Sequence, residues 1–150
     1  MFEVGLSRFR ASHDAVVRGN VLRGISSTTD AALGARALEL ALDDDLRVNE
    51  VFRPLMAQTG QPETRTAAYA WVTEHYDAIS ERIGPSTAGY LSYTGVGFCS
   101  AEQAGTVQGF FEPRAANTLG GPRNLELVIE RIRLCASRAE YARTTLEGAF

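Results

Sequence analysis

The chain has 150 residues, of which 45% are hydrophobic and 22% charged, and its formal net charge is −3. This length suits one compact domain or a short stack of repeats, and the composition excludes an intrinsically disordered chain. Basic residues gather only in residues 130–143, where two glutamates interrupt them, so the basic stripe that nucleic-acid binding needs is absent. No apolar run approaches the length of a membrane-spanning helix.

Helical periodicity dominates the first half of the chain, and no segment shows the alternation typical of a strand. We expect residues 1–11 to be the frayed end of a preceding element. Ser12 is expected to cap a helix over residues 12–25, whose apolar side chains recur on one face. A second helix is expected over residues 30–42, and we expect it to be buried because it is apolar on several faces.

Asp43, Asp44 and Asp45 follow that helix. Their charges oppose the dipole at a helix C-terminus and favour the start of another helix, so we interpret them as a turn before a helix that begins near Leu46. A metal site is the alternative, although oxygen-ligand loops need further acceptors at set positions. Pro54 should kink the next helix or mark its true start.

The second half is also helical. Pro62 suits the first turn of a long helix that carries the only tryptophan, Trp71, and Ser100 with Gln103 matches a capping box. The expected elements are a helix over residues 62–83, a short helix near 87–93, a helix over 100–111, a loop over 113–121, and a final helix over 122–146 that is bent near Ala136 and Ser137 or divided there.

These elements amount to seven or eight helices, and helix pairs arrive about every 35–45 residues, as in HEAT and armadillo repeats. The pattern predicts an all-α fold in which antiparallel helix pairs form a superhelical stack, as a single domain over residues 1–150. A compact helical bundle is the alternative.

Cys99 and Cys135 are separated by 36 positions, and each lies in an apolar context. We expect two reduced thiols in the core, because free cysteine behaves as a small hydrophobic residue. One disulfide between them is the alternative, although a single pair is no disulfide-scaffold signature.

The residues show no catalytic centre, cofactor motif or metal-ligand set. His13 and His75 lack metal-ligand spacing from each other and from the cysteines. We expect His75 to be a hydrogen-bonded core residue and His13 to be exposed. Exposed arginines on one face of a helical stack can clamp a carboxylate, and the candidates are Arg82, Arg123, Arg131 and Arg133.

The order of several segments resembles a known family, the C-terminal helical domain of zinc aminopeptidases of the aminopeptidase N and puromycin-sensitive class. The resemblance extends over about residues 9–140, and no single motif carries it. The matching segments are Ala41–Arg47, Gln61–Arg65, Ala70–Asp77, Phe98–Ser100, Val107–Phe111, Gly121–Leu125 and Val128–Cys135.

The resemblance implies a curved stack of HEAT-like helix pairs that covers a separate catalytic domain and receives the distal part of a peptide on its concave face. Zinc and the catalytic residues would belong to that upstream domain, so the fragment alone is expected to be inert. Its implied partners are the upstream domain and the peptide substrate, with no nucleic acid and no membrane.

A free-standing helical-repeat scaffold that binds another protein is the alternative function, because such scaffolds show this patterning without chemistry. A small helical enzyme with its own pocket is a third reading. If the chain is a fragment, its N-terminal end should expose apolar residues that a missing neighbour would cover, and so favour self-association. The residues concerned are Phe2, Val4, Leu6 and Phe9. The absence of a disulfide pattern leads us to expect a cytoplasmic protein.

Overall fold

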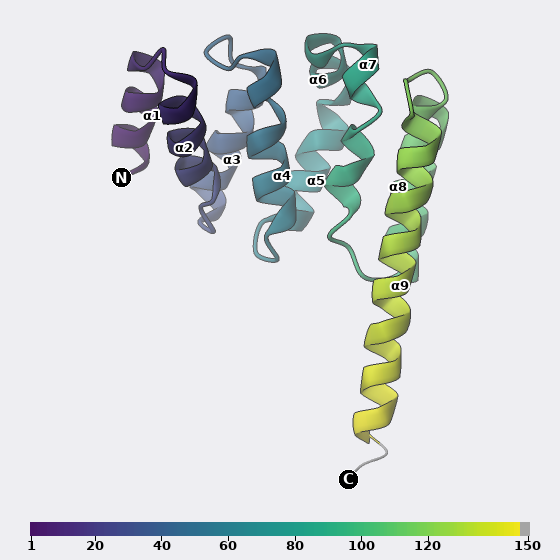
Figure 1. Cartoon of the computed structure of the whole chain (residues 1–150). Coiled ribbons are helices and arrows are strands. Elements are labelled where there is room, and N and C mark those ends of the chain that lie inside the picture. The colour runs from purple at the N-terminus through teal and green to yellow at the C-terminus, as the bar shows by residue number, and fades with distance from the viewer. Residues whose placement is uncertain (148–150) are drawn as a thin grey trace. The chain divides into compact units, whose positions relative to one another are not determined.

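A computed structural model of the chain describes residues 1–147. Over that range it contains nine α-helices and three short 3₁₀ helices, and no β-strand (Figure 1). The all-α prediction is confirmed, with one α-helix more than expected. The stacking of helix pairs into a superhelix, and the single-domain assignment, stay predictions. No helix within the described residues is long and apolar enough to cross a lipid bilayer.

Two compact units make up the chain, and each is described by itself. The first ends at Gly84, and its helices pack against one another, with α1 on α2, α2 on α4 and α4 on α5. Its elements are α1 (Phe2–Ala11), α2 (Ala15–Ser26), α3 (Ala31–Glu39), η1 (Leu40–Leu42), η2 (Val48–Glu50), α4 (Phe52–Gly60), α5 (Arg65–Glu74) and α6 (Tyr76–Ile83).

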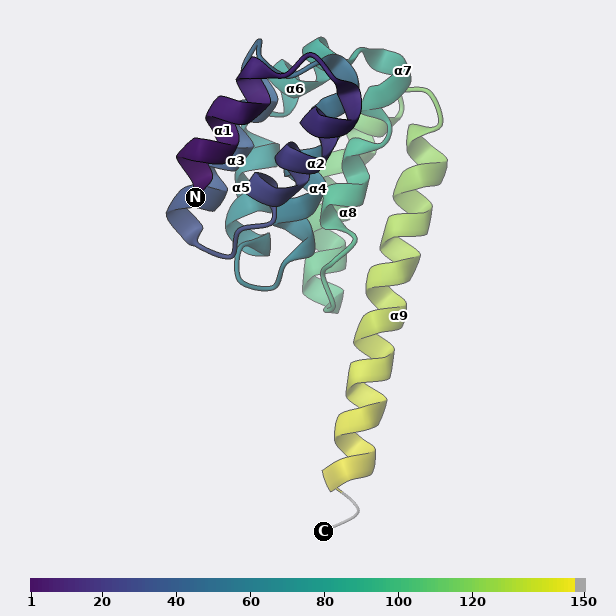
Figure 2. The ribbon, with the colours of Figure 1, turned by 60° about the vertical axis from the view of Figure 1, so that its left-hand side comes forward.

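The second unit begins at Pro85. Its helix α8 packs along α9 (Figure 2), and η3 contacts both of them. Its elements are α7 (Pro85–Ala88), η3 (Leu91–Gly95), α8 (Ala101–Ala115) and α9 (Gly121–Glu147). The final helix is therefore one uninterrupted element, without the division considered at Ala136 and Ser137.

Side-chain caps explain where three of the helices begin. Asp14 accepts hydrogen bonds from the backbone N–H groups of Val16 and Val17, at 2.8 and 2.9 Å, so α2 starts at residue 15. The expected cap, Ser12, lies outside the helix because the carboxylate of Asp14 takes the free N–H groups. Asp30 caps α3 and Ser100 caps α8 in the same way, the latter as expected.

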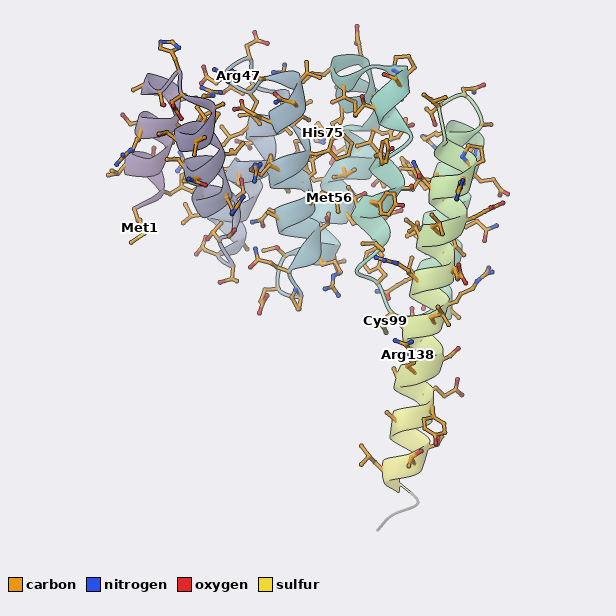
Figure 3. All side chains as sticks on the ribbon, in the orientation of Figure 1. Met1, Arg47, Met56, His75, Cys99 and Arg138 are labelled. Carbon is orange, nitrogen blue, oxygen red and sulfur yellow. A yellow bond between two sulfur atoms is a disulfide. The ribbon has the colours of Figure 1, made fainter. Side chains whose placement is uncertain are left out.

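The expected helix over residues 62–83 is divided at His75. This residue, labelled in Figure 3, leaves the helical conformation. Its Nδ1 lies 2.9 Å from the carbonyl oxygen of Trp71. Its ring stacks on the Trp71 indole, with the ring centroids 4.2 Å apart. The imidazole thus competes with the backbone for the last carbonyl groups of α5, and α6 starts afresh. His75 is half-buried instead of lying in the core.

Other boundaries differ from expectation for local reasons. Leu46 is buried in an extended turn, and α4 begins only at Phe52, with Pro54 in its first turn as one of the two expected outcomes. The helix expected to end at Phe111 continues through Pro113 to Ala115. The short helix expected near residues 87–93 is divided between α7 and η3.

Residues 2–11 form a regular helix, so the prediction of a frayed end is wrong. Phe2, Leu6 and Phe9 lie on one face of α1 and are buried, with Phe9 fully inaccessible. These three contact a core that also contains Leu22, Ile25, Ala37, Leu40 and Leu46. The expected exposure of this face is therefore wrong for all three residues, because α1 buries it against its own unit. Only Val4 is exposed as predicted.

A buried ion pair joins α2 to η2 in the first unit. The guanidinium of Arg18 donates to both carboxylate oxygens of Glu50, at 3.0 and 2.7 Å, and both side chains are at most 10% exposed. Further donor groups of Arg18 reach the carbonyl oxygens of Phe9, Ser12 and Asp45. One side chain thus joins the end of α1, the turn after it and the loop before η2.

The first prediction concerns this pair. Glu50→Gln should lower the free energy of unfolding by about 3 kcal/mol, because it leaves the Arg18 charge buried without its counter-ion. Urea unfolding followed by circular dichroism measures this difference. Arg36→Gln, which removes an exposed partner of Glu3, serves as the control and should leave the midpoint close to that of the wild type. Equal midpoints for Glu50→Gln and wild type would contradict the prediction.

The second prediction concerns acid. The hydrogen bonds from Arg18 lower the pKa of Glu50 below its ordinary value of 4.5. The charged carboxylate therefore stabilises the fold fully above pH 4.5, and this contribution is lost as the pH falls through the lowered pKa. The difference in unfolding free energy between wild type and Glu50→Gln should shrink below pH 4.5. A difference that is constant down to pH 2.5 would refute this assignment.

Candidate functional site

The most developed surface feature of the second unit is a groove between α8 and α9. Its volume is about 640 Å³, within the size range of ligand-binding clefts. The apolar part of its lining comes from Ala115, Ala116, Pro122, Leu125, Ile129 and Leu134. Leu134 is 48% exposed, so part of this apolar lining is open to solvent.

Acidic side chains border this apolar lining. Glu112 of α8 and Glu126 and Glu130 of α9 line the groove, together with the single basic residue Arg133. The guanidinium of Arg133 donates to Oε1 of Gln108 at 3.2 Å. Because carboxylates outnumber cations here, the groove is complementary to a ligand that combines apolar and basic groups.

The turn between α8 and α9 holds the two helices close together. Gly120 has a φ of +68°, a conformation that side chains rarely adopt. A Cβ at Gly121 would lie only 2.6 Å from the carbonyl oxygen of Ala115. Asn124 in the first turn of α9 donates to the carbonyl oxygen of Gly89 at 3.1 Å. Small residues at the turn therefore set the spacing at the closed end of the groove.

A disulfide joins Cys99, just before α8, to Cys135 in the middle of α9, with the Cα atoms 5.0 Å apart. The prediction of two reduced core thiols is wrong in both respects, because the cysteines are bonded and Cys135 is exposed. The periodicity had placed Cys135 on the buried face of its helix, but that face loses its covering elements beyond Ile132. Cys99 and Arg138, both labelled in Figure 3, line a second hollow at this junction.

The four candidate arginines do not form one cluster. Arg82, in the first unit, donates to Asp44 and to the carbonyl oxygens of Asp43 and Leu46, so its guanidinium joins α6 to the loop after η1. The other three lie on α9 and are exposed. Two residues of a helix turn through about 200°, so two of these three, at positions 131 and 133, face opposite flanks of α9.

The aspartate turn carries no metal cluster. Asp43 and Asp45 form ion pairs with Arg10, and Asp44 pairs with Arg82. Arginine cations thus take the place that a metal ion would occupy in the alternative interpretation. Among the described residues, no group of three or more histidine, cysteine or acidic side chains is placed to hold a metal ion.

Of the four candidate arginines, Arg133 lines the groove, but the sequence did not predict the groove itself. The available signal was Leu134, an apolar residue of the last helix that falls outside its core face and is exposed. Its exposure depends on which neighbours cover α9, and periodicity does not report this.

The third prediction concerns the disulfide. Cys135→Ser should lower the free energy of unfolding by about 3 kcal/mol, because the crosslink closes a loop of 36 positions and restricts the unfolded chain. Urea unfolding under oxidising conditions measures the loss. A reductant should bring the wild type to the midpoint of the variant and leave the variant unchanged. If the reductant shifts both proteins equally, the disulfide is not the cause.

Comparisons with known proteins place these features in context. The family described as the ERAP1-like C-terminal domain matches residues 2–134. Three curated relatives from Oryza sativa subsp. japonica are similar: Aminopeptidase M1-B and Aminopeptidase M1-C, each 26% identical, and Aminopeptidase M1-D, 25% identical. The alignments cover 95%, 95% and 99% of this chain but only 16%, 16% and 17% of the relatives.

Proposed function

Because the chain belongs to the family of ERAP1-like C-terminal domains, we propose that it is part of a larger zinc aminopeptidase. The family match confirms the resemblance noted from its sequence. In this proposal the chain is the C-terminal part of an enzyme that removes amino-terminal residues from peptides. It covers the active-site chamber and contacts the distal part of the peptide, and zinc and the catalytic groups belong to an upstream domain.

The observation that carries the proposal is the match over almost the whole chain to relatives named as aminopeptidases, of which it spans 16–17%. The α8–α9 groove supports the proposed peptide contact, because an extended segment needs an apolar surface with a few polar groups at its border.

For the peptide contact we propose Arg133 in the groove and Arg123 and Arg131 on the exposed side of α9. Arg82 would first have to release Asp44 and two carbonyl oxygens. The cytoplasmic location and the self-association of the fragment stay predictions. The first was inferred from two buried-looking cysteines without a disulfide pattern, whereas Cys99 and Cys135 are bonded. The second now relies on Val4 alone among the four residues named.

The fourth prediction tests this function in the complete polypeptide that contains the chain. Glu126→Lys combined with Glu130→Lys reverses the charge of the groove border. For peptides with basic distal residues, KM should rise about three- to tenfold with kcat unchanged, since binding away from the reacting bond is lost. KM for a single aminoacyl reporter should not change. Glu140→Lys, on α9 outside the groove, is the matched control.

Two results would contradict the proposal. The first is release of aminoacyl reporter by the pure 150-residue chain, because that activity would require a catalytic centre within it. The second is an equal change of KM for the long peptide and the short reporter, because the groove would then not contact the distal residues.

A further inference from the structure

The disulfide of the second unit lies at the surface and borders an open hollow. The hollow is lined by Cys99, Arg131, Leu134, Cys135, Arg138 and Ala139. Cys99 is half-buried, and the other five residues are exposed. Figure 3 labels Cys99 and Arg138, which mark the two ends of this lining in the sequence. A small molecule in the hollow therefore reaches the disulfide directly from solvent.

The two sulfur atoms of this bond are not equivalent. In thiol–disulfide exchange a thiolate attacks one sulfur, and the other sulfur departs as a thiolate. Cys135 is exposed on α9, so its Sγ is the accessible target. Cys99 directly precedes Ser100, the cap of α8, so a thiolate that departs on Cys99 lies at the positive end of a 15-residue helix. Exposure and the stability of the leaving group both favour attack at Cys135.

Two arginines give the hollow a positive charge. Arg131 and Arg138 lie four positions before and three positions after Cys135, so all three share one side of α9. Neither guanidinium has an ion-pair partner in the part of the chain that the structure describes. The described lining of the hollow includes no acidic side chain. The hollow therefore attracts a thiol that carries a negative charge.

We propose that Cys135 is a reversible modification site for a small anionic thiol, which the two arginines attract into the hollow. The incoming thiolate forms a bond to Sγ of Cys135, the bond between the two cysteines breaks, and its electron pair leaves on Cys99 as a thiolate. The product is a mixed disulfide at Cys135. Attack of the Cys99 thiolate on this product restores the original bond and releases the thiol, so neither direction consumes an oxidant. While the mixed disulfide is present, no crosslink joins the start of α8 to the middle of α9.

Two thiols of similar size test the charge preference: 2-mercaptoethanesulfonate, which is anionic, and 2-mercaptoethanol, which is neutral. The full chain is treated with each thiol in native buffer at low salt, and the rate constant of disulfide opening is measured per thiolate. Each rate constant is divided by that for bis(2-hydroxyethyl) disulfide, a reference without arginines. We expect the anionic thiol to be favoured about five- to tenfold, since one exposed charge at about 7 Å contributes about two- to threefold. Raising the salt to about 0.5 M should remove most of this preference.

Variants connect the preference to the hollow. Arg138→Gln should lower the preference for the anionic thiol about two- to threefold, and Arg131→Gln combined with Arg138→Gln should bring it close to that of the reference disulfide. Arg123→Gln is the matched control, because it removes the same charge from an exposed arginine of α9 that lies 12 positions from Cys135, about 18 Å along the helix axis. Circular dichroism verifies that the variants are folded.

The position of the adduct is found by rapid alkylation with N-ethylmaleimide followed by peptide mass spectrometry. We expect the sulfonate thiol on Cys135 and the maleimide on Cys99, and the reverse distribution would overturn the assignment of the attacked sulfur. A disulfide that opens only after unfolding in urea would overturn the inference, because the sulfur would then be inaccessible in the folded chain. Equal preferences in Arg138→Gln and Arg123→Gln would overturn it as well, because the charge of the hollow would then play no part.

Discussion

The first unit depends on one buried cation. Arg18 makes hydrogen bonds to the carboxylate of Glu50 and to carbonyl oxygens in three other places, and its guanidinium carbon lies 3.9 Å from the centre of the Phe9 ring. A buried charge is tolerated only when its donors are satisfied. This requirement ties the end of α1, the turn before α2 and the loop before η2 to one geometry. The hydrophobic core that contains Phe9 then forms around a fixed frame.

In the second unit a tight turn and a disulfide, instead of a buried ion pair, hold the helices in one geometry. Its two long helices are joined at one end by a tight turn at Gly120 and Gly121 and near the middle of α9 by the Cys99–Cys135 disulfide. Between these two points α8 and α9 cannot separate, so the groove along them keeps its width. Beyond the disulfide α9 continues with exposed side chains, including Tyr141 at 73% and Leu146 at 63% exposure. A rigid groove binds a flexible peptide at a smaller entropic cost than a mobile one.

Arginine side chains of the first unit neutralise carboxylates of the same unit. Arg10, Arg18, Arg36 and Arg82 are each engaged with a carboxylate of the same unit. The acidic turn at residues 43–45 is neutralised in this way. The carboxylates of the groove border are the contrasting case, since they face a surface where a ligand can supply the positive charge. The groove therefore favours basic groups.

Sequence alone determined the helical class, most helix positions and the family resemblance, because periodicity and capping residues act over a few neighbouring positions. It placed the Ser100 cap correctly, and of its two readings of Pro54 the start of a helix is the one that holds. It did not find the break at His75, which depends on the imidazole bonding to a carbonyl one turn earlier. It also assigned Phe2, Leu6 and Phe9 to an exposed face and both cysteines to the core.

Those errors have one physical reason. Burial depends on which element covers a helix face. α1 is covered mainly by α2 and α9 by α8, and periodicity does not say which face of one helix the next helix folds back onto. The disulfide likewise joins positions 36 apart. Periodicity identifies an apolar face, and only the tertiary structure decides what covers it.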